Sequence, residues 1–229
     1  MSVVFGGSKT REMYYGGRKI REAWYEGQKV YMASSGGKPV EVMPPQARAD
    51  LWLNETLSRY GLDRNTVRVI PFDIDASQAV RTVSMFSGCS SLVEAPQIDT
   101  SNVENMNNMF RWCWALTKVP DMDTSKVLFT QYMFSGCSSL VEAPQIDTSN
   151  VENMQDMFSG CGLLTKVPDM DVSKARYMQD MFSGCSSLTD GNVRLIRKDG
   201  TKPPNHFRMI YQSGLTREPF FRPDGTPID

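Results

Sequence analysis

Apolar residues recur along the middle of the chain with one fixed period. Five Met-Phe-x-x-Cys blocks, each followed by x-x-Leu, begin at Met85, Met109, Met133, Met157 and Met181. Successive blocks are therefore 24 residues apart. A period of 20 to 50 residues is typical of arrays whose units bury their apolar faces by stacking on one another.

Two kinds of unit alternate within this repeat. Residues 85–106 and 133–154 are identical, and the sequence Leu-Thr-Lys-Val-Pro-Asp-Met-Asp occurs at both 116–123 and 164–171. Ile74-Asp75-Ala76-Ser77 aligns with Ile98-Asp99-Thr100-Ser101 at the same interval. We therefore expect residues 66–190 to form one stack whose first unit is degenerate.

Each unit predicts one short helix and one short strand. Ser101 and Glu104 have the spacing of a capping box. Residues 103, 106 and 110 then place apolar side chains at helical spacing. Leu92–Ala95 predicts a strand that ends at Pro96, because proline cannot donate a ladder hydrogen bond.

Charges alternate at one equivalent position of the repeat. This charge ladder consists of Glu94, Lys118, Glu142, Lys166 and Asp190. Stacked strands lie about 4.8 Å apart, so opposite charges on neighbouring units stabilise the register of the stack. The five repeat cysteines are expected to be free thiols that fill equivalent interior positions.

The 24-residue pattern, with its Met-Phe-x-x-Cys-x-x-Leu and Asp-Thr-Ser-x-Val-x-x-Met segments, resembles the BspA-like leucine-rich repeats of bacterial surface proteins. The resemblance covers about residues 66–190. It implies an α/β fold, a leucine-rich-repeat-like right-handed solenoid of short parallel strands plus helices. Members of that family are similar to curved solenoids used for adhesion.

The first 32 residues carry a second, weaker repeat of Gly-Gly or Glu-Gly pairs between β-forming segments. Such spacing predicts a small N-terminal β meander. It resembles the Gly-Gly-x-Lys modules at the start of tail and fibre proteins of phages that infect actinobacteria; a generic surface hairpin is the alternative. Four aromatic residues are candidate docking residues of this module: Tyr14, Tyr15, Trp24 and Tyr25.

The chain therefore divides into five expected parts. These are a β-hairpin attachment module (1–33), a linker (34–43), an N-terminal capping helix (44–65), the 24-residue-repeat solenoid (66–190) and a C-terminal cap (191–229). The capping helix is expected to begin near Pro45, to turn Leu51, Trp52 and Leu57 inward, and to end at Gly61. In the C-terminal cap we expect a closing strand at 193–196 and a short helix within 205–212.

Composition excludes several classes of function. The 229 residues carry 25 Lys+Arg and 26 Asp+Glu, a net charge of −1, which gives no attraction to nucleic acid. No apolar run could insert into a membrane, and the N-terminus lacks the pattern of a signal peptide, so we expect synthesis in a host cytoplasm. One histidine and no nucleotide, phosphate or hydrolase motif predict no catalytic residue, no cofactor and no metal, although Asp121/Asp123 and Asp169/Asp171 could hold Ca²⁺ in principle.

The second repeat unit departs from the others and gives the candidate binding surface. Trp112 stands where the other units have glycine, and aromatic or apolar residues replace polar ones in the segment that follows. This aromatic patch consists of Arg111, Trp112, Trp114, Leu128, Phe129 and Tyr132. It is expected either to bind a ligand or glycan, or to pack on the N-terminal helix or on a sister subunit.

These features predict a non-enzymatic phage virion protein, a minor tail or tail-fibre component that displays a solenoid for host-surface recognition. Its expected partners are other virion proteins through the N-terminal module, a host receptor or glycan, and further copies of itself. The alternatives are a capsid decoration or tail-accessory protein, and a bacterial surface adhesin. The expected location is the virion.

Overall fold

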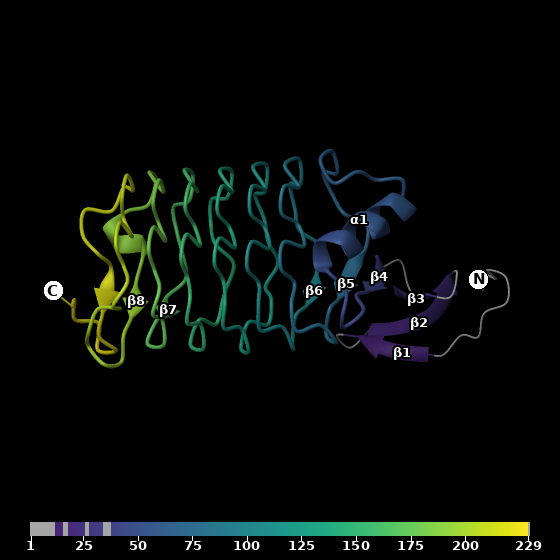
Figure 1. Cartoon of the computed structure of the whole chain (residues 1–229), viewed down its shortest axis with the longest axis horizontal. Coiled ribbons are helices and arrows are strands. Elements are labelled where there is room, and N and C mark those ends of the chain that lie inside the picture. Colours follow the sequence, from purple (N-terminus) through teal and green to yellow (C-terminus); the bar gives the residue numbers. More distant parts are fainter. Residues whose placement is uncertain (1–11, 16–17, 26–27, 34–37, 229) are drawn as a thin grey trace.

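The protein is an elongated row of coils with a β-sheet at its N-terminal end (Figure 1). The computed structural model describes residues 12–15, 18–25 and 28–33 by their backbone and residues 38–228 in full. The fold is mixed α/β, with short parallel strands and, in this described part, one α-helix. No described helix is long and apolar enough to cross a membrane.

The first sheet joins the N-terminal strands to the coils. Its spatial order is β1 (Glu12–Tyr15), β2 (Arg18–Tyr25), β3 (Gln28–Ala33), β4 (Pro39–Val42), β5 (Asp73–Asp75) and β6 (Ile98–Asp99). The pairs from β1 to β4 are antiparallel, whereas β4–β5 and β5–β6 are parallel. Residues 39–42 lie within the linker expected at 34–43, but they form the strand that hydrogen-bonds the N-terminal strands to the first coil.

A second, all-parallel sheet lies at the other end. It contains β7 (Met170–Asp171), β8 (Leu195–Ile196) and β9 (Phe220–Phe221), and a short 3₁₀ helix, η1 (Asp190–Asn192), precedes β8. The expected closing strand at 193–196 corresponds to β8. The expected helix within 205–212 is absent, because these residues form turns of one further coil that pairs with the coil before it.

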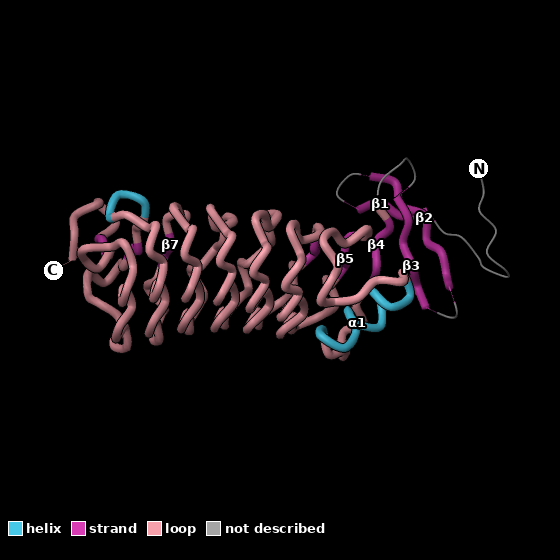
Figure 2. Tube along the Cα trace, turned by 90° about the horizontal axis from the view of Figure 1, so that it is seen from above, coloured by secondary structure: helices cyan, strands magenta, loops and turns pink. Residues whose placement is uncertain are grey.

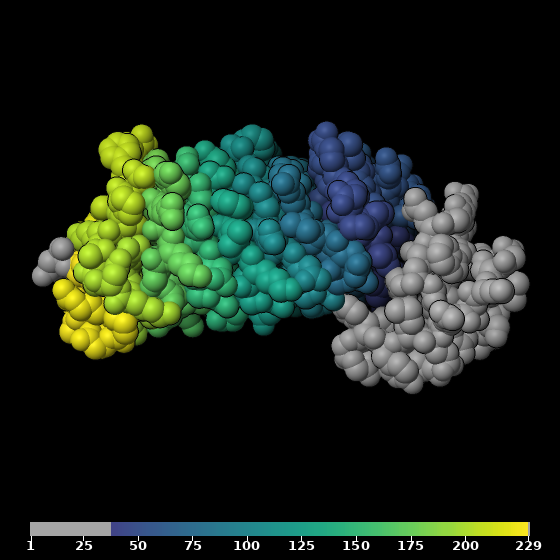
Figure 3. Space-filling model, turned by 60° about the horizontal axis from the view of Figure 1, so that its bottom comes forward, coloured from purple at the N-terminus to yellow at the C-terminus, as the bar shows by residue number. Residues whose placement is uncertain are grey.

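Hydrogen bonds between equivalent residues of neighbouring coils hold the row together. Along one edge, which we call the turn ladder, every second backbone N–H donates to the next coil, as from Phe86 to the Met109 oxygen (2.8 Å) and from Phe110 to the Met133 oxygen (2.8 Å). Seen from above, the coils follow one another at regular intervals (Figure 2), and in the space-filling view they pack side by side in sequence order (Figure 3). The 24-residue period is therefore the length of one coil.

The helix expected in each repeat unit is replaced by turns. Within 103–111 the N–H groups of Met106, Asn108 and Phe110 donate to the following coil, whereas those of Met109 and Arg111 donate three residues back. Asn108 also has a positive φ of 59°, which a right-handed helix does not allow. Nor is there a capping box, since the Glu104 N–H donates to the preceding coil and the Ser101 N–H to the Asp99 carboxylate.

The strand expected at Leu92–Ala95 is reduced to isolated bridges. Glu94 pairs with Val69 on one side and with Lys118 on the other, both in parallel. Pro96 has no N–H to extend the pairing. The regular strand of this coil is β6, a few residues further along.

Identical side chains stack on one another inside the coils. The five phenylalanines of the Met-Phe blocks are fully buried, with ring centroids 5.1–5.8 Å apart and neighbouring planes within 7° of parallel. The repeat leucines, and the repeat methionines of the same blocks, are also fully buried. Neither a polar nor a differently shaped residue fits this continuous column without leaving a void or a clash.

The five cysteines are free and buried, as the sequence predicts. Each thiol after the first donates to a phenylalanine carbonyl of the preceding coil, for example from Cys137 Sγ to the Phe110 oxygen (3.0 Å). Burial raises the pKa of the Cys89 thiol to about 11 and that of Cys185 to about 12. The cysteines are therefore protonated packing residues rather than nucleophiles.

Helix α1 (Ala49–Arg59) covers the N-terminal end of the core. It begins four residues after Pro45 and ends before Gly61, whose φ is +68°. Trp52 and Leu57 are buried as expected, but Leu51 is 48% exposed. The Glu41 carboxylate of β4, itself 3% exposed, receives hydrogen bonds from Arg59 (2.9 Å) and the Tyr60 hydroxyl (2.8 Å) and ties the helix to the sheet.

One arginine closes part of the open turn ladder at this end. The Arg64 guanidinium donates to the carbonyls of Met85 (3.0 Å) and Ser87 (2.8 Å), which face the position of a missing preceding coil. It also donates to the Asp50 carbonyl of α1 (2.8 Å). Arg64 thus supplies the donors that a further coil would otherwise provide.

Replacing this arginine should destabilise the stack from its end. Arg64→Met leaves two carbonyls of the first coil without their charged donor, and we expect the free energy of unfolding to fall by about 2–4 kcal/mol. The matched control is Arg68→Met, because Arg68 is exposed and should change stability by less than about 0.5 kcal/mol. Equal chemical-denaturation midpoints for the two variants would refute the capping role.

Candidate binding surface

Trp112 adopts a backbone conformation that tryptophan rarely takes. Its φ is 61°, close to the 74–77° of the glycines at the same position of four other coils: Gly88, Gly136, Gly160 and Gly184. For a residue with a Cβ, this left-handed conformation costs roughly 1–2 kcal/mol of free energy. The ladder imposes it, because the Trp112 N–H donates to the Ser135 carbonyl of the next coil at 2.8 Å.

The side chain of Trp112 lies over the next coil. A Cβ atom on Gly136 would lie only 2.8 Å from Trp112 Cδ1, closer than such atoms approach in proteins. The glycine is therefore needed at 136 for a second reason besides its own φ of +77°. The indole remains 49% exposed in this position.

Arg111 joins two of the aromatic rings. Its guanidinium carbon lies 4.1 Å from the Trp112 ring centroid and 4.6 Å from that of Tyr132. Its Nη1 donates to Asn108 Oδ1 at 3.3 Å, whereas its buried Nε has no hydrogen-bond partner within the described structure. Two cation–π contacts thus connect Arg111 to both rings.

The other members of the aromatic patch flank this cluster. Trp114 is 58% exposed and Phe129 is 36% exposed, while Leu128 and Tyr132 are half-buried. Phe129 lies on the turn ladder, where its carbonyl accepts from the Met106 N–H, and it bridges to Asn105 and Asn153. Both tryptophans keep about half of their surface exposed, so this part of the patch is open to solvent.

A row of polar side chains continues from Tyr132 along the same edge. The Tyr132 hydroxyl accepts a hydrogen bond from Gln155 Nε2 (3.2 Å), and Gln155 also donates to Asp156. Burial and the nearby Asp180 raise the pKa of Asp156, and Asp180 in turn pairs with Arg208 (3.2 Å). The row is anionic in the middle, with an arginine at each end.

The charge ladder forms an ion pair at one rung. Lys118 Nζ lies 2.8 Å from Glu94 Oε1 and lowers the pKa of that carboxyl. Among the described residues, Glu142 and Lys166 form a backbone bridge but no ion pair. Asp190 instead accepts hydrogen bonds from Thr216 of the C-terminal segment.

The remaining candidate residues have simpler roles. Tyr14 and Tyr15 lie in β1 and Trp24 and Tyr25 in β2, but their side chains lie outside the described residues. Three of the four paired aspartates have structural partners: Asp123 caps its own turn by accepting from the Ser125 N–H, and Asp169 and Asp171 pair with basic residues after β7. No group of three potential metal ligands occurs in the part of the chain that the structure describes.

Sequence reasoning missed how these residues meet. The repeat register could have placed Tyr132 one coil after Asn108, because the two positions are 24 residues apart. It could not show that Arg111 contacts both the Trp112 and the Tyr132 ring. It also could not show the last coil, because Arg208 follows Asp180 after 28 residues and Gln212 replaces the repeat glycine.

The repeats identify the family of the chain. Residues 80–194, half of its length, match the family described as "Mycoplasma protein of unknown function, DUF285", and the chain belongs to this family. No curated protein and no solved structure matches the chain.

The contact between Trp112 and Gly136 can be tested with a matched pair of glycines. Gly136→Ala and Gly160→Ala both place a Cβ at a φ near +76°, but only the first meets an indole; the nearest atoms to the second are 3.7 Å away. We expect Gly136→Ala to lower the free energy of unfolding by about 1–2 kcal/mol more than Gly160→Ala. In a Trp112→Gly background this difference should disappear, and a persistent difference would contradict the contact.

The charge ladder makes a second, weaker prediction. Lys118→Met should lower the free energy of unfolding by about 0.2–1 kcal/mol at low salt, whereas Lys166→Met should leave it unchanged. Because the ion pair depresses the Glu94 pKa, its contribution is present above the ordinary pKa of glutamate and is lost as the pH falls below it. Thermal melts at pH 7 and pH 3, in low and high salt, test both points; equal effects of the two substitutions would show that all rungs contribute alike.

Proposed function

We propose that this chain is a non-enzymatic recognition protein of a phage virion, a minor tail or tail-fibre component. In this proposal the repeats form a right-handed solenoid of the leucine-rich-repeat kind, and the aromatic patch contacts the host surface. The observation that carries the proposal is Trp112, which occupies a strained backbone position and still exposes half of its indole.

Strain at an exposed residue supports a binding role rather than a packing role. Glycine at the same position serves four other coils without this cost, although Gln212 takes it in the last coil, so the fold has no need of tryptophan at 112. Strained backbone that the surrounding structure maintains occurs preferentially at functional sites. Trp, Tyr and Arg are also the residues most enriched in binding hot spots.

The regular ladders support the solenoid. Bridges connect the equivalent residues of successive coils in one parallel series: Arg81, Asn105, Phe129, Asn153, Tyr177 and Asn205. A stack of this kind offers a long rigid surface on which single units can diverge, as the second unit does. The proposed ligand is a host receptor or glycan that lies along the aromatic rings.

The N-terminal sheet is the proposed attachment to other virion proteins. Among the described strands β1 pairs only with β2, and an unpaired edge can accept a strand from a partner. Further copies of the chain are a second proposed partner. The same sheet could equally attach the chain as a capsid decoration or tail-accessory protein.

A bacterial surface adhesin is the second candidate function. It is favoured by the family description, which names Mycoplasma proteins. The aromatic patch would have the same role in both cases. The two candidates differ in where the protein is located, which mass spectrometry of purified particles and of washed cell surfaces distinguishes.

The binding role can be tested by restoring the consensus of the repeat. The double variant Trp112→Gly/Trp114→Ser carries the residues of the third unit. Its free energy of unfolding should lie within about 1–2 kcal/mol of that of the wild type, because the relief of backbone strain offsets the lost contacts. We expect its binding to cells or to glycan arrays to fall at least tenfold. The control is Leu163→Ser, which removes an exposed apolar residue two coils beyond the equivalent position next to Trp114. Unchanged binding by the folded double variant would refute the role of the patch.

A further inference from the structure

The first coil has a segment of ladder that nothing in the described structure covers. In every later coil, the carbonyls at four alternate positions of the turn ladder accept N–H groups from the coil before; in the second coil these are at residues 105, 107, 109 and 111. In the first coil Arg64 takes the carbonyls of Met85 and Ser87. The carbonyls of Arg81 and Val83 and the N–H of Val80 form no hydrogen bond with any described residue.

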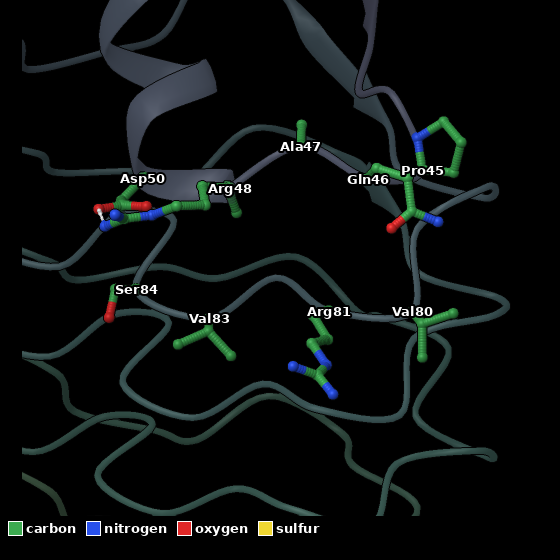
Figure 4. Close-up of a pocket in the computed structure, with 10 residues that line it drawn as sticks. Pro45, Gln46, Ala47, Arg48, Asp50, Val80, Arg81, Val83 and Ser84 are labelled. Carbon is green, nitrogen blue, oxygen red and sulfur yellow. Dashed lines mark hydrogen bonds and ion pairs between the residues drawn. The ribbon is translucent and has the colours of Figure 1, made fainter.

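This open segment forms one wall of a groove. A hollow of about 680 Å³ is lined by residues 45–50 on one side and by Val80, Arg81, Val83 and Ser84 on the other. Figure 4 shows the two segments running side by side, with the Gln46 carboxamide pointing from the first toward the second. The volume lies within the about 300–1,000 Å³ of typical ligand pockets.

The shape of the groove restricts what can occupy it. A ladder edge with free carbonyl and N–H groups pairs with another extended backbone. Because residues 45–50 wall the far side, there is room for one extended segment but not for another stacked coil. The last coil of a second copy is therefore excluded, and its Arg208 would also approach the arginines of the groove.

Charge indicates which segment fits. Arg81 is exposed and forms neither a hydrogen bond nor an ion pair with a described residue. The neighbouring Arg48 is already paired with Asp50 at 3.0 Å. A carboxylate on the bound segment, beside Arg81, would compensate the free cation.

We propose that the groove between residues 45–50 and 80–84 binds an extended acidic peptide segment of a partner protein. The segment adds a parallel rung ahead of the first coil. Its N–H groups donate to the carbonyls of Arg81 and Val83, and its carbonyl accepts from Val80. This site is separate from the aromatic patch and does not depend on the proposed recognition role.

The repeat itself supplies a probe. In register, a peptide with the sequence of residues 103–109 would direct the N–H groups of its Met106 and Asn108 at the two free carbonyls and would place residue 105 beside Arg81. Fluorescein-labelled peptides carrying Asn105→Asp or Asn105→Lys would be titrated with the full chain and followed by fluorescence anisotropy. A third peptide is the aspartate form N-methylated at positions 106 and 108.

Three results are expected. The aspartate peptide binds saturably, about three- to fivefold more tightly than the lysine peptide at low salt. The N-methylated peptide binds at least tenfold more weakly. Arg81→Glu reverses the preference between aspartate and lysine, while Arg68→Glu, a change at an exposed arginine outside the groove, keeps it.

Any of three results would overturn the proposal. These are no saturable binding up to about 1 mM peptide, equal binding of the N-methylated peptide, or an unchanged preference in Arg81→Glu. Circular dichroism and thermal melts of both arginine variants show whether the chain is folded. If Arg81→Glu does not fold, Arg81→Gln is used, and the preference for aspartate should then disappear.

Discussion

The structure depends on one constraint: alternate backbone N–H groups of each coil donate to the next coil, while those between them donate within the coil. Every second N–H in the turn ladder donates to a residue one coil ahead, so equivalent residues must lie directly above one another. This register explains the stacked phenylalanines and the identical buried cysteines, since each fills the same position in every coil. It also explains the residues with positive φ, because a chain whose N–H groups alternate between turn and ladder hydrogen bonds must change direction at these positions.

The same constraint makes the two ends of the row unlike its middle. Because the N–H groups of each coil donate to carbonyls of the next coil, the carbonyls of the first coil receive no N–H from a preceding coil. These carbonyls must find another donor or be hydrated. The N-terminal end uses three devices: β4 pairs with β5, α1 covers the apolar core, and Arg64 bonds two carbonyls of the first coil. The groove at residues 80–84 is where these three devices leave a gap.

Sequence reasoning succeeded where the repeat fixes position and failed where it had to infer backbone shape. The 24-residue period located the coils, the degenerate first unit at Ile74 and the interior cysteines, because stacking alone determines them. The apolar spacing at 103, 106 and 110 predicted a helix and was wrong. That spacing shows which side chains point inward. Turns that hydrogen-bond to a neighbouring coil place the same side chains inward, so the spacing does not distinguish them from a helix. The contacts of Arg111 with two rings and of Arg64 with two carbonyls could not be predicted, since each depends on where the end of a long side chain lies and not on its position in the repeat.

The second coil shows how a repeat protein can acquire a surface without changing its fold. The ladder fixes the backbone of residue 112 at a φ suited to glycine, and the energy of the neighbouring hydrogen bonds is large enough to hold tryptophan there. The glycine at 136 then leaves room for the indole, and Arg111 joins it to Tyr132 on the next coil. The exposed aromatic cluster therefore spans two coils that the core already holds in register, so its rings are held in place by the fold, and in the proposed binding role little conformational entropy would be lost.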